Sequence, residues 1–262
     1  MILFTLDARR VLRAAHATMD EQRKTEVGAF LRQGAWFGGL PVALQECILS
    51  RAILRTFAKG RVVQFEEGPA LGLIAILEGQ VLILRHVSEG DEPALIHVGG
   101  PGFWFGEAAV LMDKGTLVTA VAQSAVKALI LPKAEFDRIV DDEPRYYPAF
   151  ARIAFERYRL LMRFLAETLR LSPDFRLRLR LADLADLADA SRTQTILDGK
   201  AVTLDMSQSE LAGIIGLSRQ KLNVRLRQLQ EEGWVELGPR RIRVLDPAGL
   251  RATAINGLRS GR

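Results

Sequence analysis

Residues 206–246 of this 262-residue chain read MSQSELAGIIGLSRQKLNVRLRQLQEEGWVELGPRRIRVLD, and this stretch decides the fold of the C-terminal part. Ser207 and Glu210 have the spacing of a capping box, in which the side chain of each residue accepts a hydrogen bond from the backbone N–H of the other. The short apolar helix that they open ends at Gly216, because glycine can adopt the left-handed conformation that a sharp turn between helices requires.

A second helix is predicted from Arg219 to about Glu232, with Ser218 as its N-cap and Gly233 after its end. Its core face consists of three leucines at helical spacing: Leu222, Leu226 and Leu229. Positions outside this stripe carry long hydrogen-bonding side chains: Arg219, Gln220, Asn223, Arg227 and Gln230. Arginine can contact guanine in a bidentate way, and glutamine or asparagine can contact adenine, so this surface is typical of a helix that reads the major groove of DNA.

A short hairpin follows the second helix. Its strands are predicted at Trp234–Leu237 and Arg241–Leu245, around a turn at Gly238-Pro239-Arg240. Its tip and return strand carry three arginines that are placed for DNA phosphates: Arg240, Arg241 and Arg243. Short helix, glycine turn, polar helix and basic hairpin in this order indicate a winged helix-turn-helix rather than a helical subdomain with solvated charges.

Between residues 55 and 131, short β-prone runs alternate with turns, most of which contain glycine or proline. Strands at such close spacing are typical of an antiparallel barrel or sandwich. The predicted strands are Arg61–Phe65, Gly72–Leu77, Val81–Val87, Ala94–Val98, Thr116–Ala122 and Val126–Leu131. Before them, residues 40–54 have the apolar spacing of a helix, and residues 1–35 are expected to form an N-terminal extension that is partly helical.

A long amphipathic helix is predicted over residues 148–171. Its length, about 35 Å, would take it beyond a small barrel. The helix either packs on its own domain or pairs with its symmetry mate in a dimer, and we favour the dimer because the apolar stripe is large. The stripe consists of Phe150, Ile153, Tyr158, Leu161, Met162, Leu165 and Leu169.

Composition excludes several other classes of protein. The net charge of +5 favours an anionic partner such as nucleic acid. The single cysteine, Cys47, excludes a disulfide framework and an iron–sulfur cluster, since both need several cysteines. No apolar run has the roughly 18 residues of a membrane span and no signal peptide is evident, so we expect a cytoplasmic protein without a membrane partner.

In this order of parts the chain resembles the Crp/Fnr family of bacterial transcription regulators. GLSRQKLNVRLRQLQEEGWVEL, residues 216–237, resembles the family's recognition helix and the start of its wing. Leu77-Glu78-Gly79-Gln80-Val81 is similar to a turn of the family's β-roll, and GFWFGE, residues 102–107, is similar to the start of its phosphate-binding cassette. The resemblance implies an α+β fold: an N-terminal antiparallel, jelly-roll-like β-roll at 36–147, a dimerisation helix at 148–171 and a C-terminal winged helix-turn-helix domain at 172–262.

The resemblance also implies base-reading positions for Arg219 and Gln220, although Gln220 stands where glutamate is common in the family. The third such position is Val224, where the family usually has a polar or basic residue. Val224 lies about 200° from Leu222 on the helical wheel, so it is either a tolerated exposed residue or a contact for a thymine methyl group. With Asn223, these residues are the expected base contacts. The expected phosphate contacts are Ser207, Ser218, Lys221, Arg227, Arg240, Arg241 and Arg243.

The effector site is where the sequence departs from the family pattern. For a cyclic-nucleotide binder the resemblance implies a Gly-Glu pair, whose glutamate takes the ribose 2′-hydroxyl, and a later arginine that takes the cyclic phosphate. Gly106-Glu107 is present, but the arginine position falls near Thr116, and no arginine occurs between Arg85 and Arg138. Burying a phosphate without a guanidinium partner is costly, so cAMP binding is expected to be weak or absent. The expected pocket consists of Gly106, Glu107, Ala108, Thr116 and Leu117.

Other effector chemistries can be screened in the same way. Haem would need an axial ligand, for which His16, His86 and His97 are candidates, but lone histidines are more often surface or satisfied core residues, so haem is not expected. No metal site is expected. A different small ligand, or none, stays open.

Three functional hypotheses follow from the residues. The favoured one is a homodimeric transcription regulator on palindromic double-stranded DNA, with RNA polymerase as a further candidate partner. The alternative is a cyclic-nucleotide-binding module that acts through a protein partner, and the missing arginine argues against it. An enzyme is not expected, because the sequence contains no Walker loop, no Gly-x-Ser-x-Gly motif and no clear triad spacing.

Overall fold

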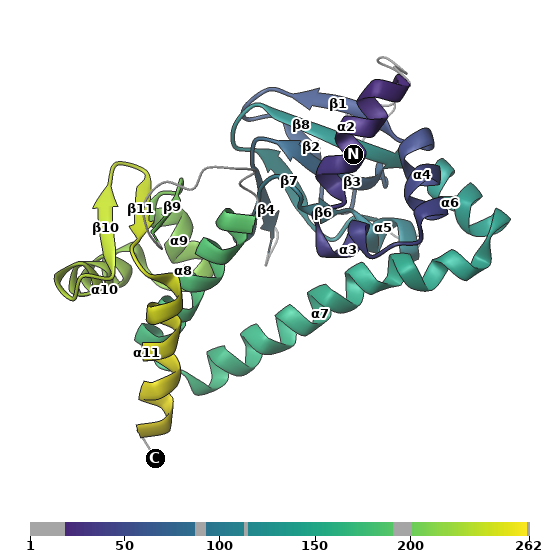
Figure 1. Ribbon diagram of the computed structural model, residues 1–262. Coiled ribbons are helices and arrows are strands. Elements are labelled where there is room, and N and C mark those ends of the chain that lie inside the picture. Colours follow the sequence, from purple (N-terminus) through teal and green to yellow (C-terminus); the bar gives the residue numbers. More distant parts are fainter. Residues whose placement is uncertain (1–18, 87–92, 113–114, 191–200, 261–262) are drawn as a thin grey trace. The chain divides into compact units, whose positions relative to one another are not determined.

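The computed structural model describes residues 19–86, 93–112, 115–190 and 201–260 (Figure 1). The chain forms two compact units, residues 1–159 and 160–262. The boundary between them falls within helix α7 (Tyr147–Arg170).

Unit 1 contains two four-stranded antiparallel sheets with a shared core, which confirms the β-roll. The first sheet has the strand order β1-β8-β3-β6 and the second has the order β2-β7-β4-β5. The strands of the first sheet are β1 (Ile53–Phe57), β3 (Gly72–Glu78), β6 (Trp104–Phe105) and β8 (Val126–Pro132). Those of the second are β2 (Val62–Gln64), β4 (Val81–Arg85), β5 (Ala94–Gly99) and β7 (Thr119–Ala122).

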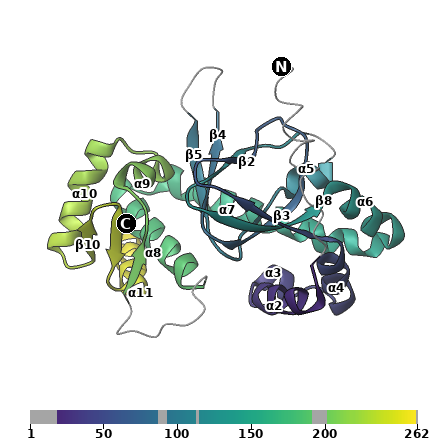
Figure 2. The same ribbon diagram turned by 90° about the horizontal axis from the view of Figure 1, so that it is seen from above.

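The first sheet is buried on both faces. Ile74 and Ile76 of β3 pack with Val81 of the second sheet, whereas the alternate residues Leu73 and Ala75 pack on the other side. Helices cover that other side, and Figure 2 shows α2, α3 and α4 gathered together. The covering helices are α2 (Glu21–Leu31), α3 (Ala35–Gly38), α4 (Val42–Arg51), α6 (Lys133–Asp142) and the first turns of α7.

The helix expected over residues 40–54 is shorter than predicted. Helix α4 ends at Arg51, Ala52 is extended, and Ile53 begins strand β1. The run Ile53-Leu54 suits a helix face and a strand equally well. The run forms a strand because it pairs with β8, and hydrogen bonding and packing in a sheet outweigh the local preference of so short a run.

Other elements of unit 1 also depart from the expectation. Strand β7 begins at Thr119 rather than Thr116. Position 87, the expected end of a strand, and the N-terminal residues 1–18 lie outside the described residues. Helix α2 lies within the extension expected to be partly helical, whereas the elements without a counterpart among the expected ones include α5 (Glu107–Met112), α6 and the 3-10 turn η1 (Pro144–Tyr146).

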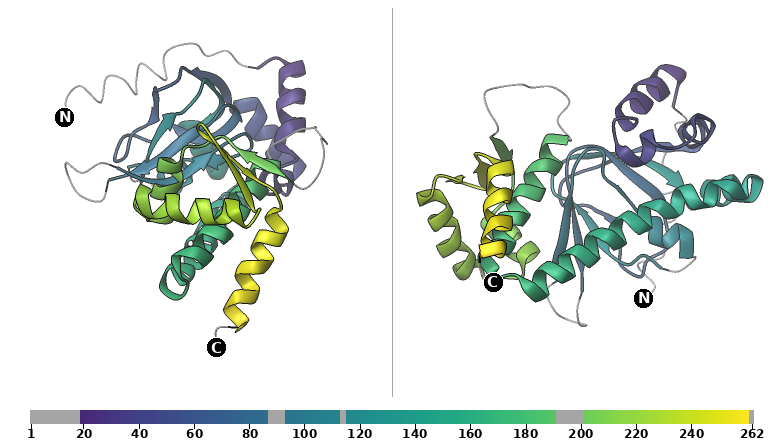
Figure 3. Two further views of the ribbon diagram at one scale, coloured as in Figure 1. Left: turned by 90° about the vertical axis from the view of Figure 1, so that its left-hand side faces the viewer. Right: turned by 60° about the horizontal axis from the view of Figure 1, so that its bottom comes forward.

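In the described residues of unit 2, the predicted winged helix-turn-helix is accompanied by two further helices and a third strand. Its sheet has the order β10-β11-β9. Its elements after α7 are α8 (Pro173–Ala190), β9 (Val202–Leu204), α9 (Gln208–Ile215), α10 (Arg219–Glu231), β10 (Val235–Gly238), β11 (Arg241–Val244) and α11 (Pro247–Ser260). Helix α11 is absent from the sequence-based expectation and lies alongside α8 (Figure 3).

A cluster of charged side chains joins the last turns of α7 to α8 and α11. Asp183 of α8 accepts hydrogen bonds from Arg163 at 2.5 Å and from Arg251 at 2.7 Å. Glu167 lies 3.4 Å from Arg163. Burial raises the pKa of Glu167 despite the neighbouring arginines. The cluster therefore fixes three helices of unit 2 through buried and half-buried charges.

Candidate nucleic-acid interface and effector site

Helix α9, the first helix of the helix-turn-helix, begins with the predicted capping box. The Ser207 Oγ accepts from the Glu210 N–H at 3.2 Å, and the Ser207 N–H donates to the Glu210 carboxylate at 2.6 Å. The helix ends at Gly216, whose φ of 72° is in the left-handed region. Because the space beside Gly216 is open, the backbone conformation and not packing requires a glycine there.

Helix α10 has the predicted division into a buried and an exposed face. Its core residues are buried: Leu222, Leu226 and Leu229. Three of the expected base contacts lie on the outer face and are exposed: Arg219, Gln220 and Val224. Val224 is 64% exposed, so an apolar side chain stands in water where a thymine methyl group could cover it.

Asn223 is placed differently from the other three expected base contacts. It is half-buried, and its Nδ2 donates a hydrogen bond to the Oε1 of Gln208 at 2.8 Å. On the helical wheel it lies about 100° from both Leu222 and Val224, on the flank of the helix. Asn223 thus joins α10 to the first turn of α9.

Two ion pairs tie α10 to α8. Arg178 donates to the carboxylate of Glu232 at 2.5 Å, and this hydrogen bond holds the pKa of Glu232 below its ordinary value although burial opposes it. Arg225 lies 2.8 Å from a carboxylate oxygen of Asp174. Both pairs lie on the side of α10 that faces α8, so they set the orientation of the helix.

The wing is the hairpin of β10 and β11, and its arginines have internal partners. At its turn, Arg240 has a φ of 50°, which a residue with a side chain rarely adopts. The ion pairs are Arg240 with Glu210 at 3.1 Å, Arg241 with Asp205 at 3.6 Å and Arg243 with Glu236 at 3.0 Å. All three arginine side chains stay about half to two-thirds exposed, so part of each guanidinium remains accessible beside its carboxylate.

The basic residues of α10 itself are less engaged. Arg219, Lys221 and Arg227 are exposed, and none of them forms a side-chain ion pair with another residue in the described part of the chain. The N-cap residues Ser207 and Ser218 each accept a backbone hydrogen bond, which leaves their hydroxyl hydrogens for a phosphate oxygen.

Three of the expected effector residues, Gly106, Glu107 and Ala108, lie at the junction of β6 and α5. Gly106 has a φ of 90°, and a Cβ there would lie 2.3 Å from the carbonyl oxygen of Gly72, so only glycine fits. Glu107 follows it with a side chain only 11% exposed, and an Oε1 that lies 2.5 Å from Nε of Arg157. Arg157 also donates to the carbonyl of Trp104.

Arg157 belongs to helix α7, fifty positions after Glu107, and sequence reasoning missed it. Its guanidinium carbon stands 4.7 Å from the centre of the Phe103 ring, in cation–π geometry. A guanidinium therefore reaches the carboxylate of the cassette, but it comes from the long helix and not from the cassette itself. No local spacing signals this contact.

The other expected pocket residues differ in their surroundings. Thr116 is buried, and its hydroxyl donates to the carbonyl oxygen of Phe65, whereas Ala108 is half-buried and Leu117 is 49% exposed. Gln64, which sequence reasoning also missed, is buried with an Oε1 that accepts no hydrogen bond from the described residues. Unit 1 thus buries three polar side chains at or near the expected pocket residues in sequence or space: Gln64, Glu107 and Thr116.

Helix α7 carries an exposed apolar stripe, with a correction at its start. Phe150 and Ile153, expected on the dimer face, are instead buried in unit 1, because the first turns of α7 cover the outer face of the first sheet. Phe155, omitted from the expected stripe, is exposed. Among the side chains that the structure describes from Phe155 onward in α7, the exposed large apolar ones are Phe155, Tyr158, Leu160, Leu161, Met162, Leu165 and Leu169.

Two of the candidate haem ligands have other neighbours. The Nδ1 of His86 lies 3.2 Å from the carboxylate of Glu66, and the ring of His97 packs 4.8 Å from that of Phe103. His16 lies outside the described residues. Within residues 19–86, 93–112, 115–190 and 201–260, no three His, Cys, Asp or Glu side chains gather in a way that could hold a metal ion. No helix in the same ranges has the length and apolarity to cross a membrane.

Two family models match the chain, one in each unit. The model of the cyclic nucleotide-binding domain matches residues 54–143, and the model of the Crp-like helix-turn-helix domain matches residues 193–253.

Two curated proteins are similar to this chain over most of their own length. The CRP-like cAMP-activated global transcriptional regulator of Mycobacterium tuberculosis is 25% identical over 198 residues, which cover 76% of this chain and 86% of the relative. The cyclic AMP receptor protein of Thermus thermophilus is 27% identical over 219 residues, which cover 83% and 95%. Among solved structures, FixK2 from Bradyrhizobium japonicum shares the fold with a TM-score of 0.65 at 16% identity, covering 78% of this chain and 96% of that one.

Proposed function

The chain belongs to the Crp/Fnr family of transcription regulators, and on this premise we propose that it acts as a homodimer on a palindromic DNA site. It is a DNA-binding regulator and not an enzyme. Two-fold symmetry would present two recognition helices about one DNA turn apart, which is why the site would be a palindrome. RNA polymerase is a candidate partner of the DNA-bound dimer.

One observation carries the dimer: the exposed stripe of α7 has the spacing of a coiled-coil seam. Phe155, Tyr158, Met162, Leu165 and Leu169 follow one another at alternating steps of three and four residues. They are between 44% and 75% exposed, so a single copy of the chain leaves them in water. A second copy of α7 would cover them, since residues at these steps form one face along a helix.

Two leucine variants test this seam. Leu165→Glu places a charge on it, and we expect the dimer to dissociate in sedimentation equilibrium, with weaker binding to a palindrome. Leu160→Glu is the matched control, because Leu160 is 58% exposed but lies about 200° from Tyr158 on the helical wheel. A dimer unaffected by Leu165→Glu, or broken equally by Leu160→Glu, would reject the seam.

The DNA face is tested separately with Arg219. In a gel-shift assay with a palindrome from the regulator's own promoter, Arg219→Ala should lose sequence-specific binding, because one bidentate base contact contributes about 1–3 kcal/mol of discrimination. Unchanged binding would remove Arg219 from the recognition surface.

We further propose that the β-roll does not bind cAMP in the manner named for its relatives. The match assigns the domain to the cyclic nucleotide-binding family, but the cassette of this chain contains no arginine between Glu107 and Thr116. Thr116 hydrogen-bonds to the backbone, and Glu107 already has Arg157 as its cation. Titration calorimetry with cAMP and with cGMP should give no saturable heat, on protein that still binds DNA. Tight binding of either nucleotide would overturn the proposal and revive a cyclic-nucleotide module.

A further inference from the structure

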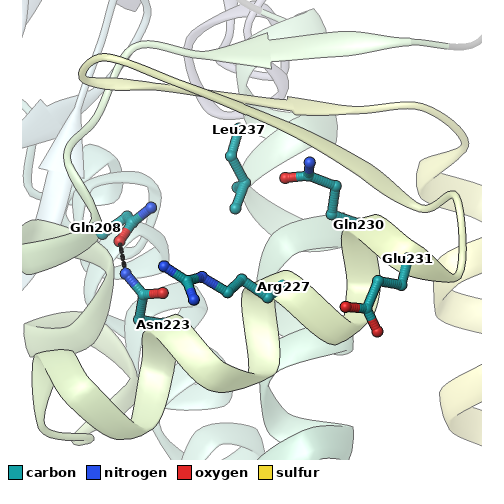
Figure 4. A pocket seen from close by; sticks show the side chains of 6 residues that line it. All are labelled: Gln208, Asn223, Arg227, Gln230, Glu231 and Leu237. Atoms are coloured by element: carbon teal, nitrogen blue, oxygen red, sulfur yellow. Dashed lines mark hydrogen bonds between the residues drawn. The ribbon is translucent and has the colours of Figure 1, made fainter.

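A groove lies between the recognition helix, the first turn of α9 and the wing. Its volume is about 520 Å³, and it is lined by Gln208, Asn223, Arg227, Gln230, Glu231 and Leu237 (Figure 4). Three elements, α9, α10 and β10, thus line a polar recess beside the face on which Gln220 and Val224 are exposed. The lining has one guanidinium, three amides and one carboxylate.

Arg227 stands out among the arginines around this groove. The three wing arginines and Arg225 each have a carboxylate within ion-pair distance. Arg227 has none in the part of the chain that the structure describes, although Glu231 is one helical turn further along the same groove. Its full charge is therefore available to an anion that enters the groove.

Gln208 is oriented by its neighbour. Its Oε1 accepts the hydrogen bond from Asn223, which leaves the two hydrogens on Nε2 as the free donors of this amide. Figure 4 shows the Gln208 amide and the Arg227 guanidinium at the same end of the groove, with Glu231 at the other end. The free N–H groups of these two side chains therefore lie together, at the end of the groove away from Glu231, the one carboxylate among the six lining residues.

We propose that Gln208 and Arg227 hold one phosphate group of the DNA backbone in this groove, and that Asn223 positions Gln208 instead of reading a base. The proposal rests on the DNA-binding function proposed above. A phosphate oxygen accepts hydrogen bonds and carries charge, which matches an amide N–H₂ beside a guanidinium. The half-buried flank position of Asn223 suits this role, because base edges face the exposed side of the helix.

The assay is fluorescence anisotropy of the full chain with a palindromic operator and with single-base variants of it, over a range of salt concentrations. Arg227→Gln should lower the slope of log affinity against log salt by about 2, equally for all operators, because the proposed homodimer loses one phosphate contact in each protomer and each contact contributes about 1 to the slope. Arg225→Gln is the matched control on the opposite flank of the same helix, and its slope should change less because Asp174 already neutralises Arg225. An unchanged slope for Arg227→Gln would refute the phosphate contact.

Gln208 is tested with two variants. Gln208→Ala removes a hydrogen bond, but no charge, from each protomer, so the affinity of the dimer should fall about tenfold or more for every operator without a change in salt slope. Gln208→Glu can still accept from Asn223 and places an acid in the first turn of a helix, which favours folding, yet it should weaken binding more because a carboxylate repels the phosphate. Equal affinity of Gln208→Glu and the wild type would overturn the proposal.

Variants of Asn223 test whether this residue positions Gln208 or reads a base. Asn223→Ala should weaken binding uniformly, and the double variant with Gln208→Ala should bind no more weakly than Gln208→Ala alone. A changed preference among operator bases, or fully additive losses, would make Asn223 a base contact and reject its positioning role. Inorganic phosphate, compared with chloride at equal ionic strength, should compete with the operator for the wild type only weakly, and strong competition would identify a site for free phosphate instead. If the wild type bound no operator, the proposed function itself would fail.

Discussion

The substitution Gly216→Ala tests the backbone conformation on which the helix-turn-helix depends. Gly216 has a φ of 72°, and no other atom lies within 4 Å of the place that a Cβ would occupy. The cost is therefore conformational alone, about 1–2 kcal/mol for an L-residue in the left-handed region. For a unit of this size the loss corresponds to a shift of the melting temperature by roughly 5–10 °C. Differential scanning calorimetry of the full chain would measure it.

Two controls separate this reasoning from a general effect of altering glycine. Gly216→Asn should cost less than Gly216→Ala, because asparagine tolerates the left-handed region better. Gly238→Ala in the wing should cost close to nothing, since Gly238 does not have a positive φ and a Cβ there would meet its nearest neighbours at 3.8 Å. If Gly216→Ala destabilised the chain no more than Gly238→Ala did, the turn would not require glycine for the reason given.

Three further predictions concern hydrogen-bonded and charged groups. Ser207→Ala removes the capping box and should lower the free energy of unfolding by about 1 kcal/mol in urea denaturation. The pKa of Glu232 is lowered in the folded chain, so its pair with Arg178 stabilises unit 2 fully at pH values above the ordinary pKa of 4.5. This stabilisation is lost as the pH falls through the lowered pKa. Thermal melts of Glu232→Gln should therefore show a smaller loss of stability in acid than those of the wild type. Arg157→Met leaves the buried Glu107 without its cation and should destabilise unit 1 by about 1–3 kcal/mol in thermal unfolding, and adding Glu107→Gln should recover part of that loss.

The helix-turn-helix could be predicted from sequence because every signal in it is local. The capping box spans four residues, the glycine turn depends on one residue, and the leucine stripe repeats within a single helix. Each of these is an interaction between near neighbours, so no tertiary contact is needed to recognise it. The structure shows the capping box, the turn and the stripe at the predicted residues.

The missed elements are those whose identity depends on distant residues. The run Ile53-Leu54 became a strand because it pairs with β8, more than seventy positions away. Phe150 and Ile153 belong to the same amphipathic helix as Leu165, and only the sheet beneath them separates the buried part of the stripe from the exposed part. A periodic pattern shows that a face is apolar, but it does not show what covers that face.

The pair of Glu107 and Arg157 shows the same limit at the effector site, where it changes the physical argument. The cassette sequence alone suggests that the Glu107 carboxylate is free to bind a ribose hydroxyl. It also suggests that the absence of the arginine removes one contact to the phosphate. With Arg157 in place, Glu107 is neutralised inside the domain and helps to hold the first half of α7 against the β-roll. Its burial then needs no ligand, because a buried charge requires a partner and not a particular one. A ligand that took the carboxylate would have to displace a guanidinium that also contacts the Trp104 carbonyl and the Phe103 ring. Such a ligand would act on α7 directly, through Arg157.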